Sequence, residues 1–132
     1  MRLMIFFAVA FASVSAVAIA SSPRQAILDD YAKQANTTSF SPERGRAFFE
    51  APHTGGKPAT PSCTTCHGKD PRQTGRTRAG KVIDPMPVSV NSKRFTDPKF
   101  VEKWFTRNCD TVLGRSCTAA EKGDFIAYLS SL

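Results

Sequence analysis

The stretch Cys63-Thr64-Thr65-Cys66-His67 decides how the rest of this chain is interpreted. It has the form C-x-x-C-H, which is the pattern of covalent haem attachment. Two thiols three positions apart can add to the two vinyl groups of one haem, and the adjacent imidazole can then bind the iron from one face. We therefore expect thioether bonds at Cys63 and Cys66, His67 as the proximal iron ligand, and one haem c per chain.

Other interpretations of this motif find less support. A thioredoxin-like redox C-x-x-C needs a surrounding βαβ pattern, and none is visible. A zinc site needs two further ligands at paired spacing, whereas only the scattered Cys109 and Cys117 remain. A chance match is the third alternative. Haem attachment also explains how a short chain with a modest supply of apolar residues can build a core, because the porphyrin adds apolar surface.

The first twenty residues have the features of a signal peptide. Arg2 supplies the charged start, an apolar run follows, and Ala18-Ile19-Ala20 is a small-x-small cleavage site. We expect residues 1–20 to be removed, which leaves a single cytochrome domain over 21–132 in the bacterial periplasm. An uncleaved membrane anchor is the alternative, and the mature chain has no apolar run long enough to span a membrane.

The chain carries a formal net charge of +7. A basic surface of this kind suits an anionic partner or ligand, although a merely solvated basic surface explains it equally well. Nucleic acid is a poor candidate, because an exported protein rarely meets it.

Four segments carry helix signals, and each begins at a capping residue. The last one is expected to place Phe125, Ile126, Leu129 and Leu132 on one face. The four starting points are Ser22-Pro23-Arg24-Gln25, Ser41-Pro42, Asp97-Pro98 and Thr118 to Glu121.

The segment that begins at Asp97-Pro98 is expected to form a helix over 98–107. Its apolar stripe would consist of Phe100, Val101, Trp104 and Phe105.

Residues 68–97 show no helical period, and only Val88-Ser89-Val90 hints at a strand. An irregular segment of this length inside a small domain is unusual unless it wraps something. We expect it to cover the haem. Seven of its cations could pair with the haem propionates, although each could equally be solvated: Lys69, Arg72, Arg76, Arg78, Lys81, Lys93 and Arg94.

Cys109 and Cys117 remain after haem attachment. In an oxidising compartment an even remainder of cysteines indicates a disulfide, and two free thiols are the alternative.

Several side chains could bind the iron from the opposite face. Met86 is the usual choice for an electron carrier, although it could equally be an apolar contact at the haem edge. His53 lies in a Gly/Pro-rich loop and is expected to be exposed. Asn108 follows Trp104 by four positions and Val101 by seven, so it continues the apolar stripe of its helix. It is therefore either an iron ligand or a helix C-cap.

Four stretches of the chain together resemble the sphaeroides haem protein family of class I cytochromes c, which is related to the cytochrome c″ group. The resemblance runs from about Glu43 to Leu129. Its motifs are PSCTTCHGKD (61–70), GKVIDPMP (80–87), KRFTDPKFVEKWFTRNCDTVLGRSC (93–117) and EKGDFIAYL (121–129). It implies an all-α, cytochrome c-like fold of four or five helices around one covalently bound haem, with a long irregular wrapping loop.

The resemblance also implies a ligand set. The asparagine before the first disulfide cysteine is an axial ligand in that family, which gives Asn108 this role opposite His67. The cytochrome c″ group has histidine there. The family usually has leucine where this chain has Met86, so methionine ligation stays open.

An amide oxygen is a hard, weak ligand that should prefer ferric to ferrous iron. Reduction would then free a coordination position. The resemblance implies binding of small diatomic ligands such as O2 or NO, with electrons taken from a dihaem cytochrome c. We expect an electron carrier or ligand-binding haem protein more readily than an enzyme. The alternative is a simple carrier with Met86 bound in both redox states.

Overall fold

The computed structural model describes residues 21–132, so the predicted signal peptide lies outside the described part of the chain. Within this part no helix has both the length and the apolar character needed to cross a membrane. The helices are α1 (Pro23–Ala35), α2 (Pro42–Glu50), α3 (Thr64–His67), α4 (Pro98–Leu113) and α5 (Ala119–Ser130), and the strands are β1 (Gly75–Arg76) and β2 (Val82–Ile83). The predicted all-α class and the four expected helices are confirmed, and the single turn of α3 was not predicted.

The four long helices begin where their capping residues predicted. Thr118 forms a complete capping box with Glu121, in which each side chain bonds the other residue's backbone N–H. Ser22 and Gln25 form only half of such a box: the Ser22 side chain accepts from the Gln25 N–H, but the Gln25 side chain donates to Asp29. The caps of α1, α2 and α4 are Ser22, Ser41 and Asp97, and each of these helices has proline in its first turn.

Helix α4 is longer than the predicted 98–107. It continues to Leu113 and ends at Gly114, whose φ of 67° lies in the left-handed region that glycine adopts without strain. No glycine or proline interrupts residues 99–113, so nothing in the sequence stops the helix earlier. Asn108 and Cys109 therefore lie inside α4 rather than after it.

The expected apolar stripe of α4 divides into two parts. Val101 and Phe105 are buried, whereas Phe100 is 56% exposed and Trp104 is 40% exposed. Positions i, i+1, i+4 and i+5 span a wide arc of a helix, and only one edge of this arc faces the core.

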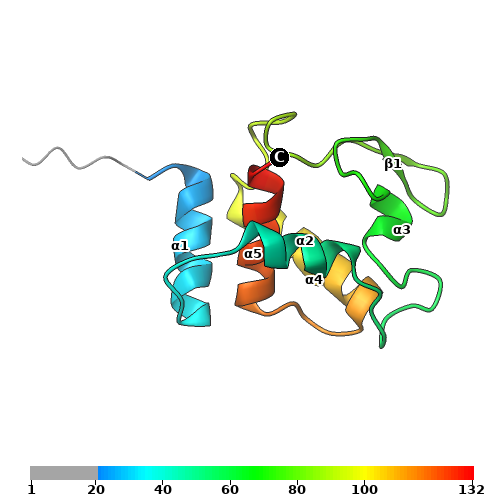
Figure 1. Ribbon diagram of the computed structural model, residues 1–132, viewed down its shortest axis with the longest axis horizontal. Coiled ribbons are helices and arrows are strands. Elements are labelled where there is room, and N and C mark those ends of the chain that lie inside the picture. The colour runs from blue at the N-terminus through cyan, green and yellow to red at the C-terminus, as the bar shows by residue number, and fades with distance from the viewer. Residues whose placement is uncertain (1–20) are drawn as a thin grey trace, which may run out of the picture.

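Helices α2 and α5 cross at close range, and Figure 1 shows α2 running across α5. Gly45 makes this approach possible. A Cβ atom at this position would overlap the backbone carbonyl of Asp124 and would lie 2.8 Å from the Cβ of Tyr128. Beside the crossing, Asp124 is buried and accepts from the Ser41 N–H at 2.7 Å and from Arg44 Nε at 2.7 Å.

The core consists of two neighbouring clusters. The smaller one contains Phe49, Tyr128 and Leu129, and it is extended by partly buried residues that include Met86 and Phe95. The larger one joins α1, α4 and α5 through Ile27, Tyr31, Val101, Phe105, Cys109, Val112, Leu113, Cys117 and Ile126. In α5, Ile126 and Leu129 are fully buried as expected, whereas Leu132 follows the end of the helix.

The segment 68–97 is largely irregular, as predicted. Its regular part is the antiparallel pair β1–β2, which pairs Gly75 with Ile83 and Arg76 with Val82. The hint of a strand at 88–90 was wrong, because these residues form a turn.

Candidate functional site

Helix α3 brings the two motif cysteines and the histidine into one helical turn. The Cys66 and His67 N–H groups donate to the Cys63 carbonyl at 3.3 and 3.1 Å. Residues three apart in a helix share a face, so the two thiols stand side by side. Both are free and partly buried. This arrangement fits attachment to two neighbouring vinyl groups.

The neighbours of α3 fix its position. The Ser62 hydroxyl accepts from the Thr64 N–H at 3.2 Å and donates to the Phe49 carbonyl at 3.4 Å. Gly75 of β1 lies so close to α3 that an added Cβ would overlap the carbonyl of Cys66. The motif is therefore held between α2 and the β1–β2 pair.

Burial shifts the pKa values of two side chains of the motif. It raises the pKa of the Cys63 thiol to about 11. It also lowers the pKa of His67 below its ordinary value, and the positive charge of Arg94 lowers that pKa further. The His67 imidazole is thus kept neutral, which is the form that binds metals.

Asn108 lies in the interior of α4 and its side chain is exposed. It does not share the face of Val101, Phe105 and Cys109, which packs in the protein core. The C-cap alternative was wrong, since Gly114 caps this helix. Asn108 instead continues the partly exposed flank of Phe100 and Trp104 at intervals of four residues, with its amide open to solvent.

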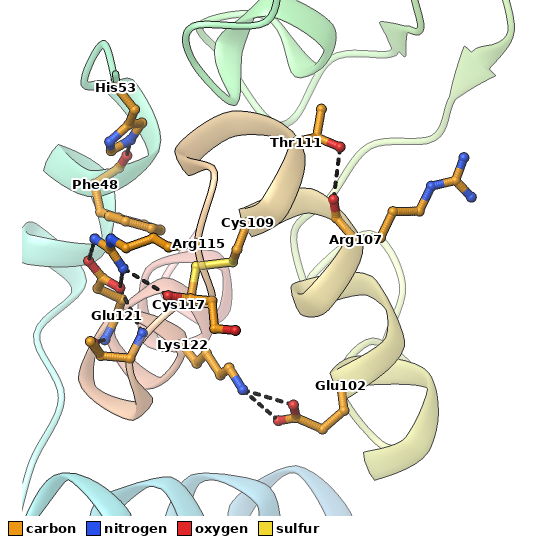
Figure 2. The surroundings of a disulfide bond; sticks show 12 residues. Phe48, His53, Glu102, Arg107, Cys109, Thr111, Arg115, Cys117, Glu121 and Lys122 are labelled. Atoms are coloured by element: carbon orange, nitrogen blue, oxygen red, sulfur yellow. Dashed lines mark hydrogen bonds and ion pairs between the residues drawn. A yellow bond between two sulfur atoms is a disulfide. The ribbon is translucent and has the colours of Figure 1, made fainter. Parts of the chain in front are cut away.

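A disulfide joins Cys109 to Cys117, with Cα atoms 5.6 Å apart and both residues buried. Figure 2 shows it bridging α4 to the segment that leads into α5. Beside it, Arg115 forms a bidentate pair with Glu121 at 2.7 and 2.9 Å, which orders the closed loop. The disulfide therefore fixes the helix turn that carries Asn108.

The other two ligand candidates have apolar or backbone contacts. Met86 is half-buried and packs against the cluster of Phe49, Tyr128 and Leu129. His53 is also half-buried, contrary to the prediction, because its Nε2 lies 2.9 Å from the Phe48 carbonyl oxygen and its ring packs on Phe48.

The residues around α3 and α4 fit a haem. A porphyrin needs apolar surface, and large apolar side chains are half exposed at Val82, Val90, Phe100 and Trp104. Its propionates need cations, and Arg94 Nε is the one buried side-chain nitrogen or oxygen without a hydrogen-bond partner in residues 21–132. From the sequence, Arg94 was one of seven possible propionate partners, and no sequence signal distinguished it from the other six.

The comparisons with known proteins agree with this fit. A family model described as a domain of unknown function (DUF1924) matches residues 35–129. The cytochrome c-type protein SHP of Cereibacter sphaeroides is 56% identical over 89 residues, which are 67% of this chain and 69% of that protein. Cytochrome c″ of Methylophilus methylotrophus is 40% identical over 86 residues, which are 64% of this chain and 60% of that protein.

Two solved structures are also similar. Oxidised SHP, described as an oxygen-binding cytochrome c, superposes with a TM-score of 0.79 at 49% identity and covers 85% of this chain and 98% of its own. The solution structure of cytochrome c″, described in terms of haem-ligand detachment, has a TM-score of 0.68 at 35% identity and covers 80% of this chain and 90% of its own.

Proposed function

The chain belongs to the DUF1924 family and is a c-type cytochrome with covalently bound haem c, and we propose on this basis that it binds small diatomic ligands at an iron whose distal ligand leaves on reduction. The all-α, cytochrome c-like fold predicted from the sequence is confirmed. Haem c supplies one-electron redox chemistry and one exchangeable coordination position at its iron.

The attachment site consists of helix α3 and its N-cap residue. Cys63 and Cys66 would form the two thioethers, and neutral His67 would bind the iron. The supporting observation is that this helix and its cap hold all three side chains together, with both thiols free. Each thiol contributes its sulfur and hydrogen to one vinyl group.

Asn108 would supply the second protein ligand to the ferric iron. The observation that carries this assignment is its position on the open flank of α4, next to a disulfide that fixes the helix. Met86 competes poorly because it already packs in the core cluster around Phe49. Cytochrome c″, one of the similar proteins, is itself described in terms of haem-ligand detachment.

The release step follows from the chemistry of the amide. An amide oxygen is a hard donor, so it binds ferric iron better than ferrous iron. Within residues 21–132 no hydrogen bond involves the Asn108 side chain, so a rotation about its own bonds frees it without disturbing α4. The oxygen-binding description of SHP supports O2 or NO as the incoming ligand.

The protein would act in the periplasm together with a redox partner. Removal of residues 1–20 leaves the domain in the periplasm, where a redox partner protein, such as a dihaem cytochrome c, supplies the electron. The basic net charge of the chain suits an acidic partner.

The test is a pair of measurements on purified holoprotein. Mass spectrometry should find residues 21–132 with one covalently added haem. The reduced protein should be high-spin and should bind carbon monoxide at once. A ferric spectrum with a methionine–iron charge-transfer band, together with slow carbon monoxide binding, would instead identify an electron carrier that uses Met86.

A further inference from the structure

The segment 68–97, which is expected to cover the haem, contains one cation that differs from the others. Of its seven candidate cations, six are exposed and only Arg94 is partly buried. Its Nη2 donates to the Pro85 carbonyl at 2.7 Å, whereas its buried Nε has no partner in the described chain. No carboxylate among residues 21–132 forms an ion pair with Arg94.

A buried, charged donor without an acceptor is energetically unfavourable. A buried N–H without an acceptor loses its hydrogen bond to water and gains none in return, and the loss is larger for a charged donor. A partly buried cation that has one unsatisfied donor and no protein anion favours binding of an anion from outside the chain.

Two further features hold Arg94 in place. Arg24 of α1 donates to the Arg94 carbonyl at 3.0 and 3.1 Å and to the Ser92 carbonyl at 2.7 Å. The next residue, Phe95, has a φ of 59°, which is strained for an aromatic residue and persists only where the surroundings impose it. The Phe95 ring packs edge-on against Phe125 at 6.4 Å. The backbone at Arg94 is thus constrained from both sides.

We propose that Arg94 binds a haem propionate through Nε, and that Arg24 and Pro85 position it for this contact. The inference rests on the proposed haem site at α3. It assigns one residue of the covering loop to the anionic edge of the cofactor and gives helix α1 a role in holding that residue. The six exposed cations are not assigned to the propionates.

The test compares three variants of the holoprotein. Arg94→Gln removes the charge and the Nε donor, Arg94→Lys keeps the charge but lacks Nε, and Lys93→Gln removes a neighbouring exposed charge as the control. A positive charge near the iron disfavours the ferric state. At a fixed potential, Arg94→Gln should therefore lower the ferrous-to-ferric ratio about tenfold, which corresponds to about 59 mV for a one-electron couple. Lys93→Gln should change it much less, because exposed charges are screened.

Resonance Raman spectroscopy supplies a second readout that a merely structural role would not change. The propionate bending mode should shift in both Arg94 variants and not in Lys93→Gln. Equal reduction potentials for Arg94→Gln and Lys93→Gln, with unchanged propionate modes, would show that solvent alone satisfies Nε and would overturn the inference. If Arg94→Gln does not accumulate, an unchanged propionate mode in Arg94→Lys is sufficient to reject it. Wild-type protein without covalent haem would overturn the proposed function instead, so the two failures are distinguishable.

Discussion

Asn108 and Cys109 are successive residues of α4, but the Cys109 side chain is buried while the Asn108 side chain is exposed. Neighbours on a helix point about 100° apart, so one turn can serve two surfaces. Cys109 ties the helix to the core through its disulfide with Cys117. The same turn presents the Asn108 amide beside Trp104.

Replacement of Asn108 by alanine should remove the proposed distal ligand. We expect ferric Asn108→Ala to become high-spin, with water or no sixth ligand. Azide should bind at least about tenfold faster, because no protein ligand must leave the iron first. A tenfold change corresponds to about 1.4 kcal/mol. Stopped-flow absorbance measures the rate. The control is Thr106→Ala, which alters another exposed position of α4 and should leave the ferric spectrum unchanged.

Met86→Leu should leave the spin state of the ferric protein unchanged. Leucine preserves the apolar contact of this side chain with the cluster around Phe49, and volume-conserving changes of this kind cost less than about 1.5 kcal/mol. The reverse pattern, with loss of six-coordination in Met86→Leu and a silent Asn108→Ala, would identify Met86 as the ligand. Ferric absorption and electron paramagnetic resonance spectra distinguish the two.

The double replacement of Cys109 and Cys117 by alanine should lower the free energy of unfolding by about 2–3 kcal/mol through the entropy of the closed loop. It should also speed azide binding, because the turn that carries Asn108 is less constrained. Guanidinium denaturation of the ferric holoprotein measures the first effect. Non-reducing peptide mapping checks the premise, and alkylation of both cysteines in the native oxidised protein would contradict it.

Gly45→Ala distinguishes helix propensity from packing. Alanine in a helix interior is favoured over glycine by about 0.8–1.0 kcal/mol, so propensity alone predicts stabilisation. The α2–α5 crossing predicts the opposite sign, because the added methyl group would overlap the Asp124 carbonyl. We expect a loss of about 1–3 kcal/mol, in the range of overpacked cores. Thermal unfolding of the holoprotein decides, and a gain in stability would contradict the close crossing.

Tyr31 should make the protein sensitive to alkali. Burial raises the pKa of Tyr31 well above its usual range, and the hydrogen bond that its hydroxyl donates to Glu102 raises it further. Above the ordinary tyrosine pKa of about 10, the unfolded chain loses this proton while the folded chain keeps it. The contribution of Tyr31 to the free energy of unfolding is therefore complete below about pH 10, and it falls by about 1.4 kcal/mol per pH unit above that pH.

Tyr31→Phe should reduce this slope while costing about 1 kcal/mol at pH 7 through the lost hydrogen bond. Burial raises the pKa of Tyr128 as well, so part of the slope should remain. Urea denaturation at pH 7 and pH 10.5 measures both effects. An unchanged slope in Tyr31→Phe would show that its hydroxyl ionises freely in the folded protein.

The helix starts were predictable because they depend on local chemistry. A serine, threonine or aspartate satisfies free N–H groups within its own turn, and this signal lies within four residues of sequence. The motif 63–67 is local for the same reason. The end of α4 was equally predictable from Gly114, but the predicted helix stopped at residue 107, where the helix in fact continues.

The interior face of α4 could not be predicted from spacing alone. Phe100, Val101, Trp104 and Phe105 are all apolar, so periodicity allows either edge of the stripe to face inward. Contacts from α1 and α5 decide, and they favour the edge of Val101 and Phe105. The importance of Arg94 was hidden for a similar reason, since its partners Pro85 and Arg24 are 9 and 70 residues away in the chain.

The crossing of α2 and α5 also determines when this protein can fold. Gly45 meets Asp124 and Tyr128, so the core needs segments from near both ends of the described chain. A chain is made from its N-terminus, and contacts of such long sequence separation form slowly. Until α5 is present, α2 lacks the helix against which Gly45 packs. The close packing at one glycine therefore makes completion of the core depend on the last of the described helices to leave the ribosome.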